Sequence, residues 1–144
     1  MTSLKEFEIP GEPKGKGRPR ATNKGGYTRM YTDSQTLSYE AEIRFLYTNK
    51  IGEFFEGPVQ MEIEVYQGIP KSTSKKKRQA MINKEILPIK KPDADNIAKI
   101  ICDALNGVAY KDDTQICHLL IKKFYCEIPR VLIKIGSYSI GSKL

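Results

Sequence analysis

The residues of this chain that could do chemistry form a short acidic run in an otherwise basic protein. Asp93 and Asp95 stand close together, Lys99 follows at the spacing of one helical turn, and Asp112-Asp113 form a second acidic pair. Residues 91–113 hold five Asp against three Lys, whereas the whole chain carries a formal net charge of +7. A basic protein attracts phosphates and clustered carboxylates repel them, and a divalent cation bound between the two kinds of oxygen resolves that conflict. The run therefore indicates metal-dependent chemistry on nucleic acid.

The stretch that begins at Asp95 has the periodicity of an amphipathic helix. At about 100° per residue, apolar residues gather on one side and polar residues on the other. The apolar side holds Ile97, Ile100, Ile101, Ala104 and Leu105, and the polar side holds Asp95, Asn96, Lys99, Asp103 and Asn106. Asp95, Lys99 and Asp103 then form a ladder of i, i+4 neighbours. Asp93 or Asp95 begins the helix, where backbone amides favour a carboxylate, and Gly107 stops it.

The second acidic pair stands at the entry to the next expected strand. A strand that returns along the helix would bring Asp112-Asp113 back toward Asp93 and Asp95. A purely structural interpretation stays open at this point: one Asp caps the helix, Lys99 pairs with its acidic neighbours, and Asp112-Asp113 make a turn.

Three other metal or phosphate motifs do not fit these residues. An EF-hand loop that starts at Asp93 would need Gly and Glu where the chain has Ala98 and Ala104. A nucleotidyltransferase would need a Gly-rich phosphate cradle, and none is present in the sequence. Cys117 and His118 are adjacent, but a structural zinc site would need a second pair of ligands.

Two basic segments are the candidate surfaces for a polyanionic partner. Residues 1–30 carry seven basic against three acidic side chains, and residues 71–90 carry seven against one. The first segment contains a Gly- and Pro-rich stretch, about residues 14–30, which predicts a flexible basic loop. The second predicts a short helix capped by Ser72 or Ser74. The candidate phosphate contacts are Lys16, Arg18, Arg20, Lys75, Lys76, Lys77 and Arg78.

The rest of the chain predicts one domain over residues 1–144 that mixes strands and helices. Alternating apolar residues predict strands at 6–9 and 59–65. A helix should begin at Asp33 or Ser34 and end at 49–52, with Leu37, Ala41, Phe45 and Thr48 inside and Glu40, Glu42 and Arg44 on wetter faces. Residues 116–125 and 131–135 should form an antiparallel hairpin.

The composition excludes several classes of protein. The longest apolar stretches have the length of strands, so we expect no membrane span, and the N-terminal residues do not resemble a signal peptide. The chain has three cysteines, an odd number with no C-x-x-C pair, which argues against a disulfide framework and fits a reducing cytoplasm.

The acidic run resembles the signature of a known family. Residues 91–115 read Lys-Pro-Asp-x-Asp-Asn-x-x-Lys-x-x-x-Asp-Ala-Leu-Asn-Gly-x-x-x-x-Asp-Asp-x-Gln, which is similar to RusA-type Holliday junction resolvases, the RusA family of crossover junction endodeoxyribonucleases. The stretches 9–11, 16–20 and 31–32 resemble the phage- and prophage-associated branch of that family, and the basic stretch 74–78 also fits.

The resemblance carries implications for fold, site and partners. It implies an α+β fold in which a two-layer mixed β-sheet packs against helices, and a homodimer that nicks opposed strands of branched DNA, a four-way junction. It assigns Mg²⁺, with Mn²⁺ as a substitute, to Asp93, Asp95 and Asp113, with Asp112 the less certain member of its pair. Lys99 becomes the essential catalytic cation, and Asn96 and Asp103 become supporting residues, Asp103 by holding Lys99. One metal ion or two would satisfy this pattern.

Two other functions compete with this interpretation. One is a nucleic-acid-binding module that does not catalyse a reaction and whose acidic helix is structural. The other is a metal-dependent nuclease with a different specificity, for flaps or single strands. Cleavage of a four-way junction, a duplex and a flap with and without Mg²⁺ separates all three.

Overall fold

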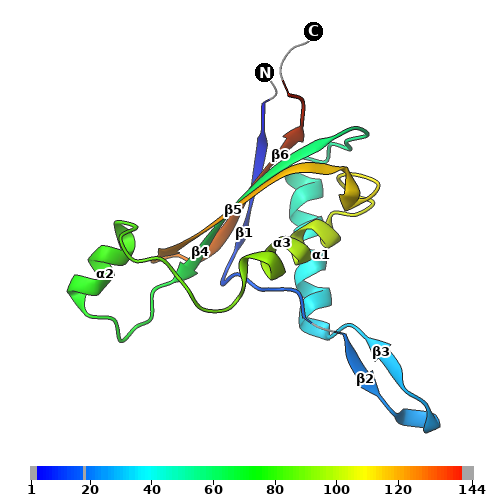
Figure 1. Ribbon diagram of the computed structural model, residues 1–144, viewed down its shortest axis with the longest axis horizontal. Coiled ribbons are helices and arrows are strands. Elements are labelled where there is room, and N and C mark those ends of the chain that lie inside the picture. Colours follow the sequence, from blue (N-terminus) through cyan, green and yellow to red (C-terminus); the bar gives the residue numbers. More distant parts are fainter. Residues whose placement is uncertain (1–2, 18, 141–144) are drawn as a thin grey trace.

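A mixed four-stranded sheet and the helices packed against it carry the acidic run (Figure 1). The computed structural model describes residues 3–17 and 19–140. The elements in chain order are β1 (Lys5–Pro10), β2 (Arg20–Thr22), η1 (Lys24–Gly26), β3 (Arg29–Tyr31), α1 (Ser34–Lys50), β4 (Val59–Gly68), α2 (Lys75–Ile82), α3 (Ala94–Ala104), η2 (Asp113–Gln115), β5 (Ile116–Cys126) and β6 (Arg130–Ser137). This arrangement confirms the expected α+β class. No helix in the described part of the chain is long and apolar enough to cross a bilayer.

The sheet topology explains how the two halves of the acidic run meet. The strand order is β1-β6-β4-β5, and β4 pairs antiparallel with β6 but parallel with β5. Parallel neighbours need a crossover connection, and here that connection contains α2, α3 and η2. The crossover lays α3 beside β5 and returns the chain to the start of β5 directly after Asp112 and Asp113.

The core lies between the sheet and helices α1 and α3. Every second residue of β4 is buried from Val59 to Val65, and β6 alternates in the same way. The five residues of the predicted apolar side of α3 are completely buried: Ile97, Ile100, Ile101, Ala104 and Leu105. The periodicities that predicted β4 and α3 are therefore confirmed.

Helix α1 has the predicted ends but not the predicted inner face. Asp33 caps it by accepting a hydrogen bond from the Thr36 amide, and the helix ends at Lys50. The inner side is formed by Thr36, Tyr39, Glu40, Ile43 and Tyr47, whereas Leu37 and Phe45 are 51% and 66% exposed. The prediction that Leu37, Ala41, Phe45 and Thr48 lie inside is wrong, because all four are exposed. The placement of Glu40 on a wetter face is also wrong. Tyr39, Ile43 and Tyr47 follow one another at i, i+4 spacing, and burying these large side chains stabilises this face of the helix against the core. Tyr47 packs edge-on against Phe7.

The predicted hairpin between residues 116–125 and 131–135 is wrong. β5 and β6 run in opposite directions, but β4 lies between them and pairs with both. The link between β5 and β6 passes the end of β4 near Gly68, where an added Cβ would lie 2.3 Å from Oε2 of Glu12 and 3.7 Å from the Pro129 ring. The glycine makes room for the Glu12 carboxylate, which accepts a hydrogen bond from the Gly68 amide at 3.2 Å. No local pattern in the sequence predicts that the β5–β6 link passes β4.

The predicted flexible loop at 14–30 is also partly wrong. Residues 20–31 form a small antiparallel hairpin, β2–β3, which projects away from the sheet (Figure 1). Its turn contains Gly25 and Gly26, both with positive φ, which glycine adopts without strain. Residues 13–17 form a strap across α3, where the Lys16 amide donates a hydrogen bond to the Asn96 carbonyl at 3.0 Å.

Candidate active site

An open hollow between α3 and β5 gathers most of the predicted catalytic residues. Asp95 and Lys99 come from the first two turns of α3, and Asp113 comes from η2 at the entry to β5. The hollow measures about 630 Å³, and its other walls are mostly apolar: Ala94, Ala98, Cys102, Ile116, Leu119 and Ile121. As predicted, the chain that returns toward the helix brings Asp113 to the same hollow as Asp95.

Asp113 has an electrostatic environment that disfavours its charged form. Burial raises the pKa of its carboxyl group, and the negative charges of Asp112 and Asp103 raise it further, as does a hydrogen bond with the Asp103 carboxyl group. The Lys99 ammonium acts in the opposite direction. A cation placed beside these carboxylates would relieve their repulsion.

Asp112 caps the short helix η2. Its side chain accepts a hydrogen bond from the Thr114 amide at 3.3 Å, and with Gln115 it forms a reciprocal capping box at the start of η2. The hydrogen bond from Thr114 lowers the pKa of the Asp112 carboxyl group. Gln115 also donates to the carbonyls of Phe55 and Gly57 at 2.9 and 3.0 Å, which fixes the turn that carries Asp113.

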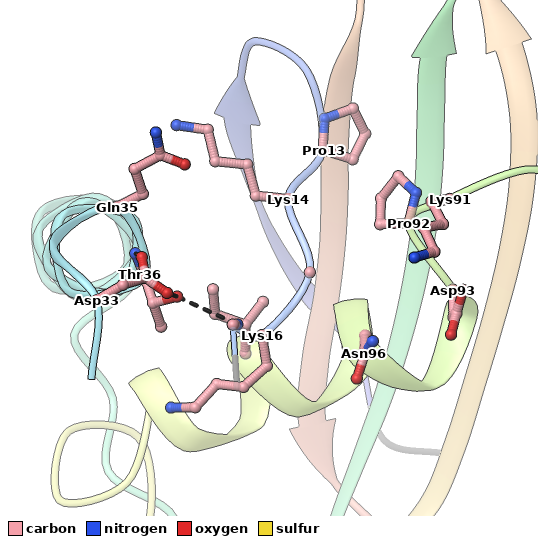
Figure 2. Close-up of a pocket in the computed structure, with 13 residues that line it drawn as sticks. Pro13, Lys14, Lys16, Asp33, Gln35, Thr36, Lys91, Pro92, Asp93 and Asn96 are labelled. Carbon is pink, nitrogen blue, oxygen red and sulfur yellow. Dashed lines mark hydrogen bonds between the residues drawn. The ribbon is translucent and has the colours of Figure 1, made fainter. Parts of the chain in front are cut away.

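Asp93 faces a different cleft. It stands at the N-cap position of α3, yet its side chain makes no capping hydrogen bond. It lines a cleft of about 620 Å³ together with the strap, Lys91 and Asn96 (Figure 2). The three predicted metal ligands are thus divided between two adjoining concave surfaces at the start of α3.

The carboxylates of these surfaces fit Mg²⁺ as partial ligands. Among residues 3–17 and 19–140, no three His, Cys, Asp or Glu side chains converge as a complete metal cage. Mg²⁺ is usually bound through one or two carboxylates plus substrate phosphates and water. Asp95 and Asp113 supply hard oxygen donors of that kind in one hollow.

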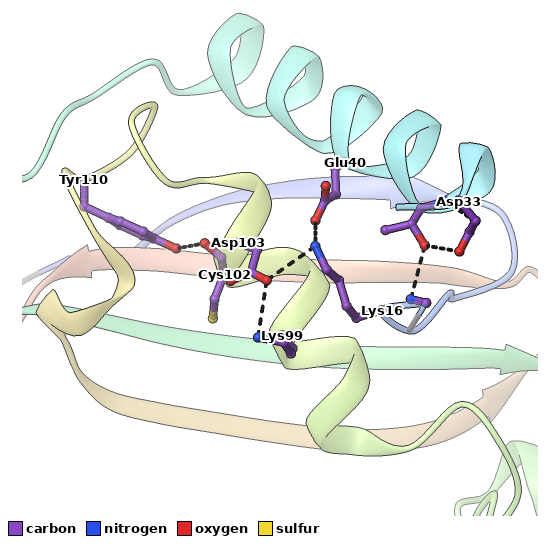
Figure 3. A network of polar contacts seen from close by, with 9 residues as sticks. Lys16, Asp33, Glu40, Lys99, Cys102, Asp103 and Tyr110 are labelled. Carbon is purple, nitrogen blue, oxygen red and sulfur yellow. Dashed lines mark hydrogen bonds and ion pairs between the residues drawn. The ribbon is translucent and has the colours of Figure 1, made fainter. Parts of the chain in front are cut away.

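Lys99 belongs to a chain of ion pairs that joins three segments (Figure 3). Its ammonium lies 3.5 Å from Oδ2 of Asp103, which confirms the predicted contact. The same Oδ2 lies 3.4 Å from Nζ of Lys16. Nζ of Lys16 also donates to Oε2 of Glu40 at 2.6 Å. Burial alone would lower the pKa of Lys16, but the hydrogen bond and charge of Glu40 and the charge of Asp103 outweigh it, so the pKa is raised.

A match to a family model covers most of the chain. The model describes endodeoxyribonuclease RusA, and it matches residues 10–136. This chain belongs to the RusA family. It is also 36% identical over 137 residues to the uncharacterized protein YqaN of Bacillus subtilis (strain 168), and the alignment covers 93% of this chain and 96% of YqaN. The family is one of nucleases, enzymes that hydrolyse phosphodiester bonds in DNA.

Lys16, a predicted DNA contact, is held in the chain of ion pairs, and the other predicted contacts that the structure describes lie on α2 and at the start of β2. Lys75, Lys76 and Lys77 are exposed on α2, which Ser74 caps as predicted. Arg78 is half-buried, donates to the Pro70 carbonyl and lies 3.8 Å from Glu127. Arg20 begins β2 in the projecting hairpin, and Arg18 lies outside the described residues.

Sequence reasoning missed two residues of the RusA-family site. Glu40 lies on the inner side of α1 and pairs with Lys16, and its phase with Thr36, Ile43 and Tyr47 was the available signal. Gln115 fixes the turn beside Asp113. The spacing of Asp112 and Gln115 matches that of a capping box and could have identified it.

Proposed function

We propose that this RusA-family protein is a Mg²⁺-dependent, structure-specific endodeoxyribonuclease that resolves Holliday junctions by paired symmetric nicks. The observation that carries the proposal is the presence of Asp95, Lys99 and Asp113 in one hollow of a chain with net charge +7. Such a hollow provides oxygen ligands and a cation for a phosphate, and the basic remainder of the protein attracts the DNA.

The side chains of the hollow have separate roles in this proposal. Asp95 and Asp113 would supply carboxylate oxygens to Mg²⁺, or to Mn²⁺ in its place, and the substrate phosphate and water would complete its ligands. Asp93, which faces the other cleft, stays a predicted ligand outside this pair. When bound, the ion polarises the scissile phosphate and favours ionisation of an attacking water. The Lys99 ammonium offsets the charge that develops on the phosphate oxygens in the transition state. The Cys102 thiol takes no part, because burial raises its pKa to about 12. Displacement of the leaving oxygen gives a 5′-phosphate and a 3′-hydroxyl.

We propose that the active form is a homodimer on a four-way junction. Paired nicks in two opposed strands need two sites in a fixed relation. The outer edge of β5 supports this arrangement, since within the described residues no strand pairs with it. An uncovered strand edge presents unpaired backbone amides and carbonyls, which are a template for pairing with a second chain. We also propose that the protein acts in the cytoplasm, where its free thiols would stay reduced.

A panel of DNA substrates tests the proposed function. Purified protein is incubated with a synthetic four-way junction, a linear duplex and a flap of matched sequence, each with and without Mg²⁺. Nicks at symmetric positions on opposed strands, in the junction and only with Mg²⁺, are expected. Binding without cleavage in any metal would indicate a module that only binds nucleic acid. Cleavage of the flap in preference to the junction would indicate a nuclease of different specificity.

A further inference from the structure

The ion pairs around Asp103 form a chain of alternating charge that leads from a buried helix side to the hollow (Figure 3). Its order is Glu40 on α1, Lys16 on the strap, Asp103 on α3 and Lys99 at the hollow. Lys16 and Lys99 contact the same carboxylate oxygen of Asp103, at 3.4 and 3.5 Å. The Asp103 carboxylate is therefore shared by two ammonium groups, and each of them weakens the ion pair of the other.

The inner end of this chain is buried and tightly paired. Glu40 is only 8% exposed, and its carboxylate is 2.6 Å from Nζ of Lys16. An ionised carboxylate at such a position is costly unless it is paired. The pairing holds the Lys16 ammonium between Glu40 and Asp103, and a DNA phosphate would have to compete with both carboxylates for it.

The backbone of the strap is held independently of the Lys16 side chain. The Lys16 amide donates to the Asn96 carbonyl at 3.0 Å, and the Gly17 amide donates to Oγ1 of Thr36 at 3.1 Å. At Gly15, an added Cβ would lie 3.1 Å from Cβ of Asn96, so the strap lies directly against α3. A change at the tip of the Lys16 side chain can therefore alter the charge chain while these backbone contacts remain.

We propose that Lys16, held by Glu40, is a positioning residue for the nuclease reaction and acts through Asp103 on Lys99. Lys16 offsets part of the negative charge of Asp103. The ion pair between Asp103 and Lys99 is then weak enough for the Lys99 ammonium to contact a phosphate in the hollow. Without Lys16, Asp103 would draw Lys99 toward itself and away from the scissile phosphate. Lys99 is the most exposed member of the chain of ion pairs, since its side chain is 62% exposed against 24% for Asp103 and 21% for Lys16. This inference rests on the proposed function, and it replaces the predicted role of Lys16 as a phosphate contact.

The test separates the rate of the chemical step from DNA affinity. Single-turnover cleavage of the four-way junction is measured with saturating enzyme in Mg²⁺, and junction affinity is measured without Mg²⁺ over a range of salt. Lys16→Met should lower the saturating rate on the order of 10- to 100-fold, as loss of an outer supporting residue does. Its Kd and salt dependence should stay close to those of the wild type. Lys16→Arg should restore part of the rate, and Lys50→Met, which removes an exposed lysine of α1, should change nothing.

Double variants show whether the effect passes through Asp103. In an Asp103→Asn background there is no charge for Lys16 to neutralise, so adding Lys16→Met should change the rate little further. Glu40→Gln should lower the rate less than Lys16→Met and should add nothing to it, because neighbours in one network are not additive. Circular dichroism and thermal unfolding identify variants that lose the fold, and Lys16→Arg and Glu40→Gln preserve side-chain volume for that reason.

Three results would overturn the inference. A normal saturating rate for Lys16→Met with a weaker Kd and a smaller salt slope would make Lys16 a DNA contact. An equal loss of rate with and without Asp103→Asn would show that Lys16 does not act through Asp103. Loss of the fold in Lys16→Met, with normal rates for Lys16→Arg and Glu40→Gln, would reduce the pair to structural support. Failure of the wild type to cleave the junction would instead overturn the proposed function itself.

Discussion

Asp112 and Asp113 are neighbours in the chain but have different surroundings. Asp112 caps η2 through the Thr114 amide and is exposed, while Asp113 lines the hollow with Asp95 and Lys99. A capping carboxylate has its oxygen directed at a backbone amide. Asp113 is therefore the member of the pair whose oxygens are placed to meet a metal ion.

The pH dependence of cleavage should report this difference. Burial and the charges of Asp112 and Asp103 raise the pKa of Asp113, and Asp113 must be ionised to bind a metal. Activity should therefore fall, as the pH is lowered, at a higher pH than an ordinary carboxyl group would give. Asp112→Asn removes one of the repulsive charges, so the acid limb of kcat/KM against pH should move to lower pH.

Asparagine is a suitable replacement because it also caps helices. At neutral pH and saturating Mg²⁺, Asp112→Asn should retain cleavage close to the wild-type rate. Asp113→Asn is the matched comparison and should be inactive. An equal loss of activity in both variants would mean that Asp112 also binds the metal, and a fixed acid limb would mean that Asp113 does not set it.

At the level of single residues, the sequence predicted contacts within one helix but not between segments. The i, i+4 spacing of Lys99 and Asp103 was enough to predict their ion pair. Glu40 and Lys16 are 24 residues apart, and no local pattern links them. Their pairing depends on the strap crossing between α1 and α3, which is a property of the tertiary fold.

Among the elements, strong periodicity predicted α3 and β4 correctly, and weak periodicity misled for α1. Helix α3 has one continuous apolar side, so only one rotation of the helix about its axis buries that side in the core. Helix α1 has apolar or aromatic residues on several sides, and the packing of Tyr47 against Phe7 decides which side is buried. The pairing of β5 was not predictable locally, because its partner β4 lies before two intervening helices.

The exposed lysines of α2 should act on DNA affinity rather than on catalysis. Changing Lys75, Lys76 and Lys77 together to Gln should weaken junction binding and lower the slope of log K against log salt, by about 0.9 for each phosphate that is no longer neutralised. The cleavage rate at saturating enzyme should stay the same. Binding titrations at several salt concentrations measure the slope, and Lys50→Gln serves as the single-charge control.

One result would contradict the proposed role of these lysines in DNA affinity. An unchanged salt slope, combined with a lower saturating rate, would place them in catalysis or in the fold instead. Arg78 is kept in the triple variant because it donates to the Pro70 carbonyl and faces Glu127, so its replacement would also disturb α2.

For the whole molecule, the acidic site lies between two projecting basic parts. Helix α2 extends from one side of the sheet and the β2–β3 hairpin from the other, with α3 between them (Figure 1). This layout fits a DNA strand that is held on both sides of the bond to be cut. The distribution of charge along the sequence predicted the two basic segments. The β2–β3 hairpin and its direction could be seen only in the three-dimensional fold.

The most direct test of the central claim is the single-turnover rate of four-way junction cleavage by Asp95→Asn in Mg²⁺. Asp95 is exposed and makes the hollow jointly with Lys99 and Asp113, so its replacement should not disturb the fold. We expect a loss of at least about 1,000-fold, equivalent to about 4 kcal/mol of transition-state stabilisation, with junction binding unchanged or tighter because a repulsive charge is gone. Cleavage at the wild-type rate would contradict the assignment of this hollow as the active site.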